Sequence, residues 1–66
     1  MSVMKVLEIM AESEKSWEDA TAKAVAKASV TVKDIRSAYV QEQSVTVTEN
    51  EVHLYRINLK ITFEVR

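Results

Sequence analysis

A chain of 66 residues is one small domain with a marginal core of its own, and such domains usually need a disulfide, a structural metal or self-association. The absence of cysteine excludes disulfides and thiolate metal sites, the absence of glycine excludes phosphate-binding glycine loops, and a single histidine excludes an imidazole-rich zinc site. With disulfides and metal sites excluded, self-association is the source of stability that remains. The 9 Lys+Arg and 10 Asp+Glu give a nearly balanced charge, which argues against a nucleic-acid partner.

The first element along the chain is a strand over about residues 3–10, a stretch rich in Val, Ile, Leu and Met. A polar stretch, residues 12–16, follows it. Ser13 or Ser16 is suited to cap a helix there, because its hydroxyl can accept a hydrogen bond from a free N–H of the first turn. Glu18 and Asp19 then suit the positive end of the helix dipole.

The second element is a helix from Trp17 to about Thr31, where apolar residues recur at intervals of three and four. Most of this stripe is alanine, so the helix can approach a sheet closely while Trp17 anchors one end. The stripe consists of Trp17, Ala20, Thr21, Ala24, Ala28 and Val32.

Two further strands complete the chain. Residues 39–48 alternate imperfectly, and Glu49-Asn50-Glu51 is a turn in which Asn50 is the best candidate for a positive φ. Residues 53–66 alternate cleanly between apolar and polar side chains, which predicts a long strand with one buried face. The buried face should carry His53, Tyr55, Ile57, Leu59, Ile61, Phe63 and Val65.

These elements predict an α+β fold of the order β-α-β-β, a single domain over residues 1–66 whose three-stranded antiparallel sheet wraps around one helix. A helix of about fifteen residues spans roughly 22 Å, whereas a strand of similar length spans nearer 50 Å. The sheet should therefore extend beyond its helix, and its uncovered surface and edges predict a symmetric homo-oligomer.

Several segments together resemble the dodecin family. They are the short first strand with its serine-rich turn, residues 16–20 (Ser-Trp-Glu-Asp-Ala), residues 34–36 (Asp-Ile-Arg) and residues 55–63 (Tyr-Arg-Ile-Asn-Leu-Lys-Ile-Thr-Phe). The resemblance covers nearly the whole chain and rests on order, spacing and total length rather than on any one motif. It implies a hollow homododecamer of 23 symmetry.

The resemblance also implies a ligand site. Flavin-binding dodecins hold riboflavin-like ligands between subunits, where a tryptophan stacks on the ring and a glutamine hydrogen-bonds its edge. Ser37 and Arg56 stand at those two positions here. Serine has no π-surface, and arginine donates hydrogen bonds but cannot accept them. The chain thus resembles more closely the branch called calcium dodecins, which shares the Asp-Ile-Arg and Tyr-Arg-Ile segments and for which calcium is the reported ligand.

Ser37, Tyr39 and Arg56 are accordingly the candidate cofactor-binding residues. Tyr39 lies two residues beyond Ser37 and so on the same face of its strand, where it is either a replacement stacking platform or an ordinary interface tyrosine. Arg56 either binds the phosphate of FMN or a similar anion, or forms an inter-subunit ion pair with a carboxylate such as Glu42.

No metal ligand is assigned, because the chain has no EF-hand-like loop. A calcium site would have to be assembled across subunits from surface carboxylates, and otherwise those carboxylates are solvated charge. His53 is expected to be structural or solvent-facing, and no nucleophile–base pair indicates an enzyme. The calcium candidates are Glu12, Glu14, Glu18 and Asp19.

The functional hypothesis is a homododecamer that binds and stores a small ligand between its subunits, either a flavin such as riboflavin or FMN or a related cofactor. The alternative is a shell without flavin that binds calcium or serves as a scaffold. No apolar stretch reaches the roughly 20 residues that cross a bilayer, and residues 1–6 lack a secretion signal. We therefore expect a cytoplasmic protein with no membrane and no nucleic-acid partner.

Overall fold

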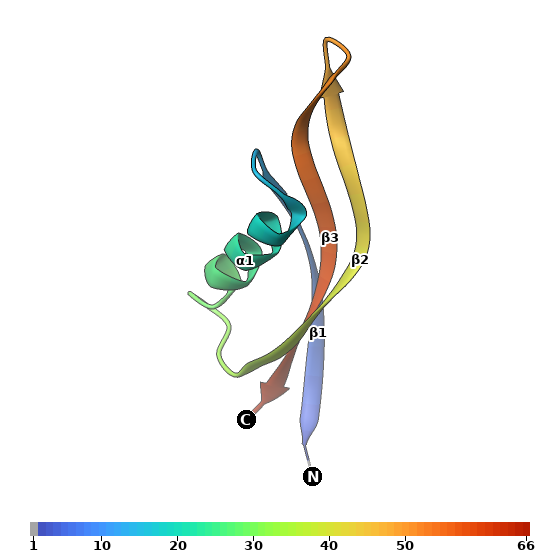
Figure 1. Ribbon diagram of the computed structural model, residues 1–66. Coiled ribbons are helices and arrows are strands. Elements are labelled where there is room, and N and C mark those ends of the chain that lie inside the picture. The colour runs from blue at the N-terminus through green and yellow to red at the C-terminus, as the bar shows by residue number, and fades with distance from the viewer. Residues whose placement is uncertain (1) are drawn as a thin grey trace.

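The computed structural model describes residues 2–66 and confirms the β-α-β-β order (Figure 1). Strand β1 (Val3–Ser13) is followed by helix α1 (Trp17–Ala28) and by strands β2 (Ile35–Thr48) and β3 (Glu51–Val65). Strand β1 ends three residues later than predicted, and β2 begins four residues earlier. Among the described residues, no helix is long and apolar enough to cross a membrane.

The three strands form one antiparallel sheet in the order β1-β3-β2. Leu59 of the central strand lies opposite Ile9 of β1 and opposite Val40 of β2. Because β3 pairs on both sides and has one face against the helix, it shows the most regular alternation in the sequence. The two edges of the sheet, β1 and β2, have one unpaired side each.

The core lies between the middle of β3 and helix α1. Ile57, Leu59 and Ile61 are at most 1% exposed and pack under Ala20 and Ala24 of the helix. Burying each of these three β3 side chains stabilises the fold by about 1.5–3 kcal/mol. The predicted alternation is confirmed at the centre of β3, whereas His53 and Val65 at its ends are exposed because α1 does not reach them.

The helix is held at its start by two serines with different partners. The hydroxyl of Ser16 caps the helix by accepting a hydrogen bond from the Asp19 N–H at 2.9 Å. The hydroxyl of Ser13 instead donates to Asp19 Oδ2 at 2.6 Å. The helix ends at Ala28, three residues before the predicted end, because the N–H groups after it turn back onto the last carbonyls.

Strand β2 alternates imperfectly because its pairing with β3 is interrupted three times. The register shifts lie between Ile35 and Ser37, between Val40 and Glu42, and between Thr46 and Val47. Each bulge places an extra residue on one strand and moves the following side chains to the other face.

The β2–β3 hairpin closes through Glu49 and Asn50, which both have positive φ angles of 53° and 65°. Two consecutive positive φ values are typical of the tight turns that join twisted antiparallel strands. The prediction for Asn50 is confirmed, while Glu49 adopts the same strained region without a residue type that favours it.

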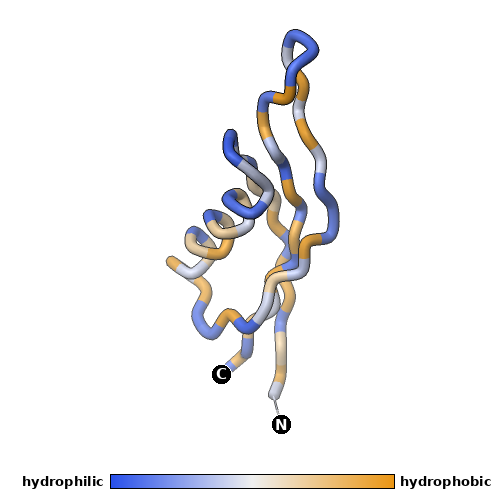
Figure 2. The backbone as a smooth tube through the Cα atoms, in the orientation of Figure 1, coloured by the Kyte–Doolittle hydropathy of each residue, from blue (hydrophilic) through white to orange (hydrophobic). Residues whose placement is uncertain are grey.

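The molecule is elongated, with principal extents of 51 × 19 × 13 Å. The hairpin extends well beyond the helix, and the N- and C-termini lie together at the opposite end (Figure 1). A helix of 12 residues covers only about 18 Å of that length. Apolar and polar residues alternate along the strands, and the hairpin turn is polar (Figure 2). The predicted mismatch between sheet and helix is confirmed.

Candidate ligand-binding surface

The sheet has a face turned away from α1, which we call the outer face. On β3 it consists of the alternate residues that the helix does not cover, and the register assigns their partners on β1 and β2 to the same face. It comprises Met4, Val6, Glu8, Met10 and Glu12 of β1, Ser37, Tyr39, Glu42 and Ser44 of β2, and Arg56, Asn58, Lys60, Thr62 and Glu64 of β3.

Ser37 and Tyr39 lie on the outer face, opposite Thr62 and Lys60 respectively. No register shift separates them, so the prediction that they share one face of the strand is confirmed. The side chain of Tyr39 is 67% exposed, which leaves its ring accessible to a partner. Ser37 is exposed too, and offers only a hydroxyl.

Arg56 also lies on the outer face, but its ion pair differs from the one predicted. Its Nε lies 3.0 Å from Glu12 Oε2 of the same chain, and its Nη2 donates to the sulfur of Met10 at 3.1 Å. No partner within the chain was predicted from the sequence, and the β1–β3 register provides one by placing Glu12 directly opposite Arg56. An inter-subunit pair with Glu42 stays a prediction, because the structure describes one chain.

A hollow of about 170 Å³ surrounds the Arg56 side chain, and we call it the Arg56 pocket. Within the described chain, Asn58 Oδ1 and Arg56 Nε are buried without a hydrogen-bond partner, although Nε is within ion-pair distance of Glu12. An unpaired buried polar atom costs about 1–3 kcal/mol. The pocket is lined by Met10, Glu42, Ser44, Arg56, Ile57 and Asn58.

A single chain does not bring the three predicted site residues together. Ser37 lies opposite Thr62, six residues along β3 from Arg56. At about 3.4 Å per residue this corresponds to roughly 20 Å along the sheet. One flat ligand that touched both Ser37 and Arg56 would have to lie between two copies of the chain.

The predicted calcium candidates divide into two kinds. Asp19 accepts the Ser13 hydroxyl and pairs with Lys23 Nζ at 2.9 Å, and these contacts hold its pKa below its ordinary value. Glu12 pairs with Arg56, whereas Glu14 and Glu18 are exposed and form no ion pair with the described residues.

These carboxylates do not form a metal site within one chain. Over residues 2–66 there is no group of three His, Cys, Asp or Glu side chains that could hold a metal ion. Calcium takes six to eight oxygen ligands. The residues of one chain therefore do not fit a calcium ion, and a site would require oxygens from other copies.

Trp17 has the anchoring role that the sequence indicates, and His53 faces solvent. The indole N–H of Trp17 donates to the Ser44 carbonyl oxygen at 3.0 Å, and its ring meets Tyr55 edge to face with centroids 5.2 Å apart. Trp17 thus anchors the helix to β2 and is not free to stack on a ligand. His53 is exposed near the hairpin turn.

Asn58 and Ser44 are among the residues of the Arg56 pocket that were not predicted from the sequence as site residues. Asn58 lies two residues from Arg56 in the alternating strand and therefore on the same outer face. That alternation could have identified Asn58 as a neighbour of Arg56. Ser44 gave no comparable signal, because the register shift between Val40 and Glu42 changes which β2 residues face outward.

Comparison with known proteins gives one consistent family. The family model described as Dodecin matches residues 3–66. The calcium dodecin of Mycobacterium tuberculosis is 46% identical over 66 residues, covering 100% of this chain and 93% of that protein.

Solved structures agree with that match. The crystal structure of the calcium-chelating antigen calcium dodecin of Mycobacterium tuberculosis, described as having a novel calcium-binding site, superposes with a TM-score of 0.86 and 45% identity over 98% of this chain and 93% of that one. A mutant dodecin of Thermus thermophilus superposes with a TM-score of 0.94 and 29% identity, covering 100% of this chain and 98% of that one. The dodecin of Streptomyces coelicolor superposes with a TM-score of 0.94 over 98% of this chain and 93% of that one. At 22% identity, this likeness shows the fold alone.

Proposed function

The chain belongs to the dodecin family, and on that premise we propose that it assembles into a closed dodecamer that binds calcium between its subunits rather than flavin. The observation that carries the proposal is the composition of the outer face. Ser37 offers no π-surface for a flavin ring, and Arg56 is engaged with Glu12 and Met10. The role is one of binding and storage rather than catalysis.

Self-assembly is supported by the surface that one chain leaves uncovered. Both edge strands have unpaired backbone groups, and such edges attract further copies. Large apolar side chains are exposed on the outer face at Met4, Val6 and Met10 and at the hairpin end at Val47 and Val52. These patches lie at both ends of a 51 Å molecule, so several neighbours are needed to cover them.

Calcium is supported by the relative and by two free carboxylates. The relative at 46% identity over the full chain is named for calcium. Glu14 and Glu18 lie at the loop before α1 and in its first turn, exposed and without ion pairs to the described residues. Each chain would contribute one or two carboxylates, and bound calcium would neutralise those that assembly brings together.

The test compares two double variants of equal charge change. Calcium binding to the chelator-stripped oligomer is measured by isothermal titration calorimetry, with magnesium as the control ion, for the natural protein, Glu14→Gln/Glu18→Gln and Glu49→Gln/Glu51→Gln. We expect saturable calcium binding that the first variant loses and the second retains. Equal binding by all three proteins, or no binding by the natural one, would contradict the calcium proposal.

Flavin binding is a second candidate because of Tyr39. Its ring is exposed on the outer face two residues from Ser37, and an aromatic face is what a flat ligand stacks on. If Tyr39 serves this role, riboflavin fluorescence is quenched by the natural protein and recovers in Tyr39→Ala. Equal quenching by both proteins would exclude Tyr39 as the platform.

A further inference from the structure

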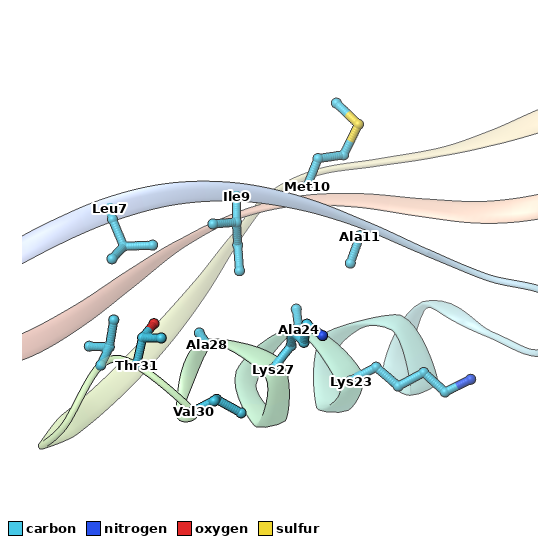
Figure 3. A pocket seen from close by; sticks show the side chains of 11 residues that line it. Leu7, Ile9, Met10, Ala11, Lys23, Ala24, Lys27, Ala28, Val30 and Thr31 are labelled. Carbon is cyan, nitrogen blue, oxygen red and sulfur yellow. The ribbon is translucent and has the colours of Figure 1, made fainter.

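A second hollow lies on the other side of the sheet, between helix α1 and edge strand β1. It has a volume of about 540 Å³ and shares one lining residue, Met10, with the outer face. Figure 3 shows Leu7, Ile9 and Ala11 pointing from β1 toward the helix, while Met10 points away from it. We call this hollow the α1–β1 groove.

The walls of the α1–β1 groove are apolar and belong to one chain. Leu7, Ile9 and Ala11 form one wall, and Ala24 and Ala28 form the other. The groove exists because the alanines of the helix are too small to fill the space opposite Leu7 and Ile9. Its volume lies within the range of about 300–1,000 Å³ that is typical of small-ligand sites.

The rim of the groove is positively charged. Lys23 and Lys27 are lining residues on successive turns of α1. Lys23 is paired with Asp19 at 2.9 Å, so its charge is largely balanced. Lys27 is exposed and forms no ion pair with the described residues, and no acidic residue lines the groove. An apolar cleft with one uncompensated ammonium group suits a ligand that is apolar along its length and anionic at one end.

We propose that the α1–β1 groove binds a free, single-chain aliphatic carboxylate, with its hydrocarbon chain between β1 and α1 and its carboxylate at Lys27. The hydrocarbon is favoured by removal of apolar surface from water, at about 25 cal/mol per Å². The carboxylate is favoured by the ammonium group of Lys27. This site is separate from the calcium and flavin proposals and does not depend on them.

A free aliphatic chain fits better than a membrane or a second copy of the protein. Both walls come from the same chain, so the groove is formed before any partner arrives. The uncompensated charge of Lys27 at the rim then favours a ligand with an anionic end over an uncharged apolar surface.

The test uses the assembled protein and the fluorescent fatty acid cis-parinaric acid below its micelle concentration. We expect a saturable rise in its fluorescence, reversed by decanoate and more weakly by decanol. Lys27→Met should weaken decanoate about threefold to fivefold, the size of one exposed ion pair, and leave decanol unchanged. Lys15→Met, which removes a charge outside the groove, is the matched control. Equal weakening by both lysine variants would overturn the assignment of the carboxylate to Lys27.

Ala28→Leu fills the groove without lowering helix propensity, because leucine ranks close to alanine. We expect it to abolish the fluorescence rise while leaving the assembled mass unchanged by light scattering. Unchanged binding in Ala28→Leu would overturn the proposal. An absence of binding to the natural protein would also overturn it, and a change in assembled mass in Ala28→Leu would then indicate that the groove is a contact between copies. Binding to anionic phospholipid vesicles without binding of the free acid would overturn it in favour of a membrane surface. Calcium titrations of Lys27→Met and Ala28→Leu test the calcium proposal separately, because neither substitution changes a calcium candidate.

Discussion

The two faces of strand β3 differ in burial and in chemistry. On the inner face, Ile57, Leu59 and Ile61 are at most 1% exposed and meet the alanines of the helix. On the outer face, Arg56 and Asn58 alternate with them, partly exposed, and each has a buried polar atom without a hydrogen-bond partner in the described chain. One strand thus packs the core with every second residue and leaves the intervening residues partly exposed on the surface of the chain.

The core and the chemistry of the outer face can therefore vary independently in so small a protein. Inner-face residues are fixed by volume and apolarity, because a change there opens a cavity or buries a charge. Outer-face residues contact solvent or another copy and tolerate different chemistry. Substitutions on the two faces of β3 and at the start of the helix test that separation.

The largest effect is expected from Leu59→Asp, because an ionised carboxylate would be buried on the inner face without a partner. We expect a loss of more than about 4 kcal/mol, enough to remove most of the folded protein. Circular dichroism and light scattering would report an unfolded or unassembled chain. Lys60→Asp, one residue along on the outer face, is the control and should remain folded. A folded Leu59→Asp variant would contradict the separation of the two faces.

A smaller effect is expected from Trp17→Phe, which keeps an aromatic ring against Tyr55 but removes the indole N–H. The Ser44 carbonyl then loses its donor, and the hydrogen bond that ties the helix to β2 is lost. We expect unfolding to become easier by about 1 kcal/mol, measured by urea denaturation. An unchanged midpoint would show that this hydrogen bond does not stabilise the helix against the sheet.

Arg56→Gln should change the free energy of unfolding by less than about 1 kcal/mol, since its ion pair with Glu12 is at the surface. The same urea measurement checks this. A loss comparable to that of an inner-face substitution would mean that Arg56 is part of the core rather than of a binding surface.

The smallest effect is a pH dependence that arises from Asp19. The Ser13 hydroxyl and Lys23 hold the pKa of Asp19 below its ordinary value in the folded protein. Its carboxylate therefore favours folding above the unfolded pKa, and this contribution disappears as the pH falls through the folded value. The difference in urea midpoint between the natural protein and Asp19→Asn should be present at pH 7 and vanish in acid. A constant difference would show that the charge of Asp19 is not responsible.

The sequence predicted most of the fold because its strongest patterns lie where burial is most complete. The alternation of β3 and the alanine stripe of the helix identified Ile57, Leu59, Ile61, Ala20 and Ala24 correctly. The end of the helix was placed three residues too late, because Val32 continues the apolar period although the chain has already turned.

The candidate site was harder to predict, since it depends on the register of the strands. The partner of Arg56 is Glu12 because β1 and β3 align in that register, which no local pattern specifies. The bulges of β2 decide that Ser44 faces outward beside Arg56. Ser37 and Tyr39 share a face as expected, and their distance from Arg56 follows only from the pairing with β3.

The most direct test of the outer-face account is a riboflavin fluorescence titration of the assembled protein with and without calcium. It compares the natural protein with Ser37→Trp/Arg56→Gln, which restores a π-surface and an amide. We predict no saturable quenching by the natural protein under either condition, and saturable quenching by the double variant at a fixed ratio to subunits. Saturable quenching by the natural protein, or none by the double variant, would contradict the claim that these two residues decide against flavin.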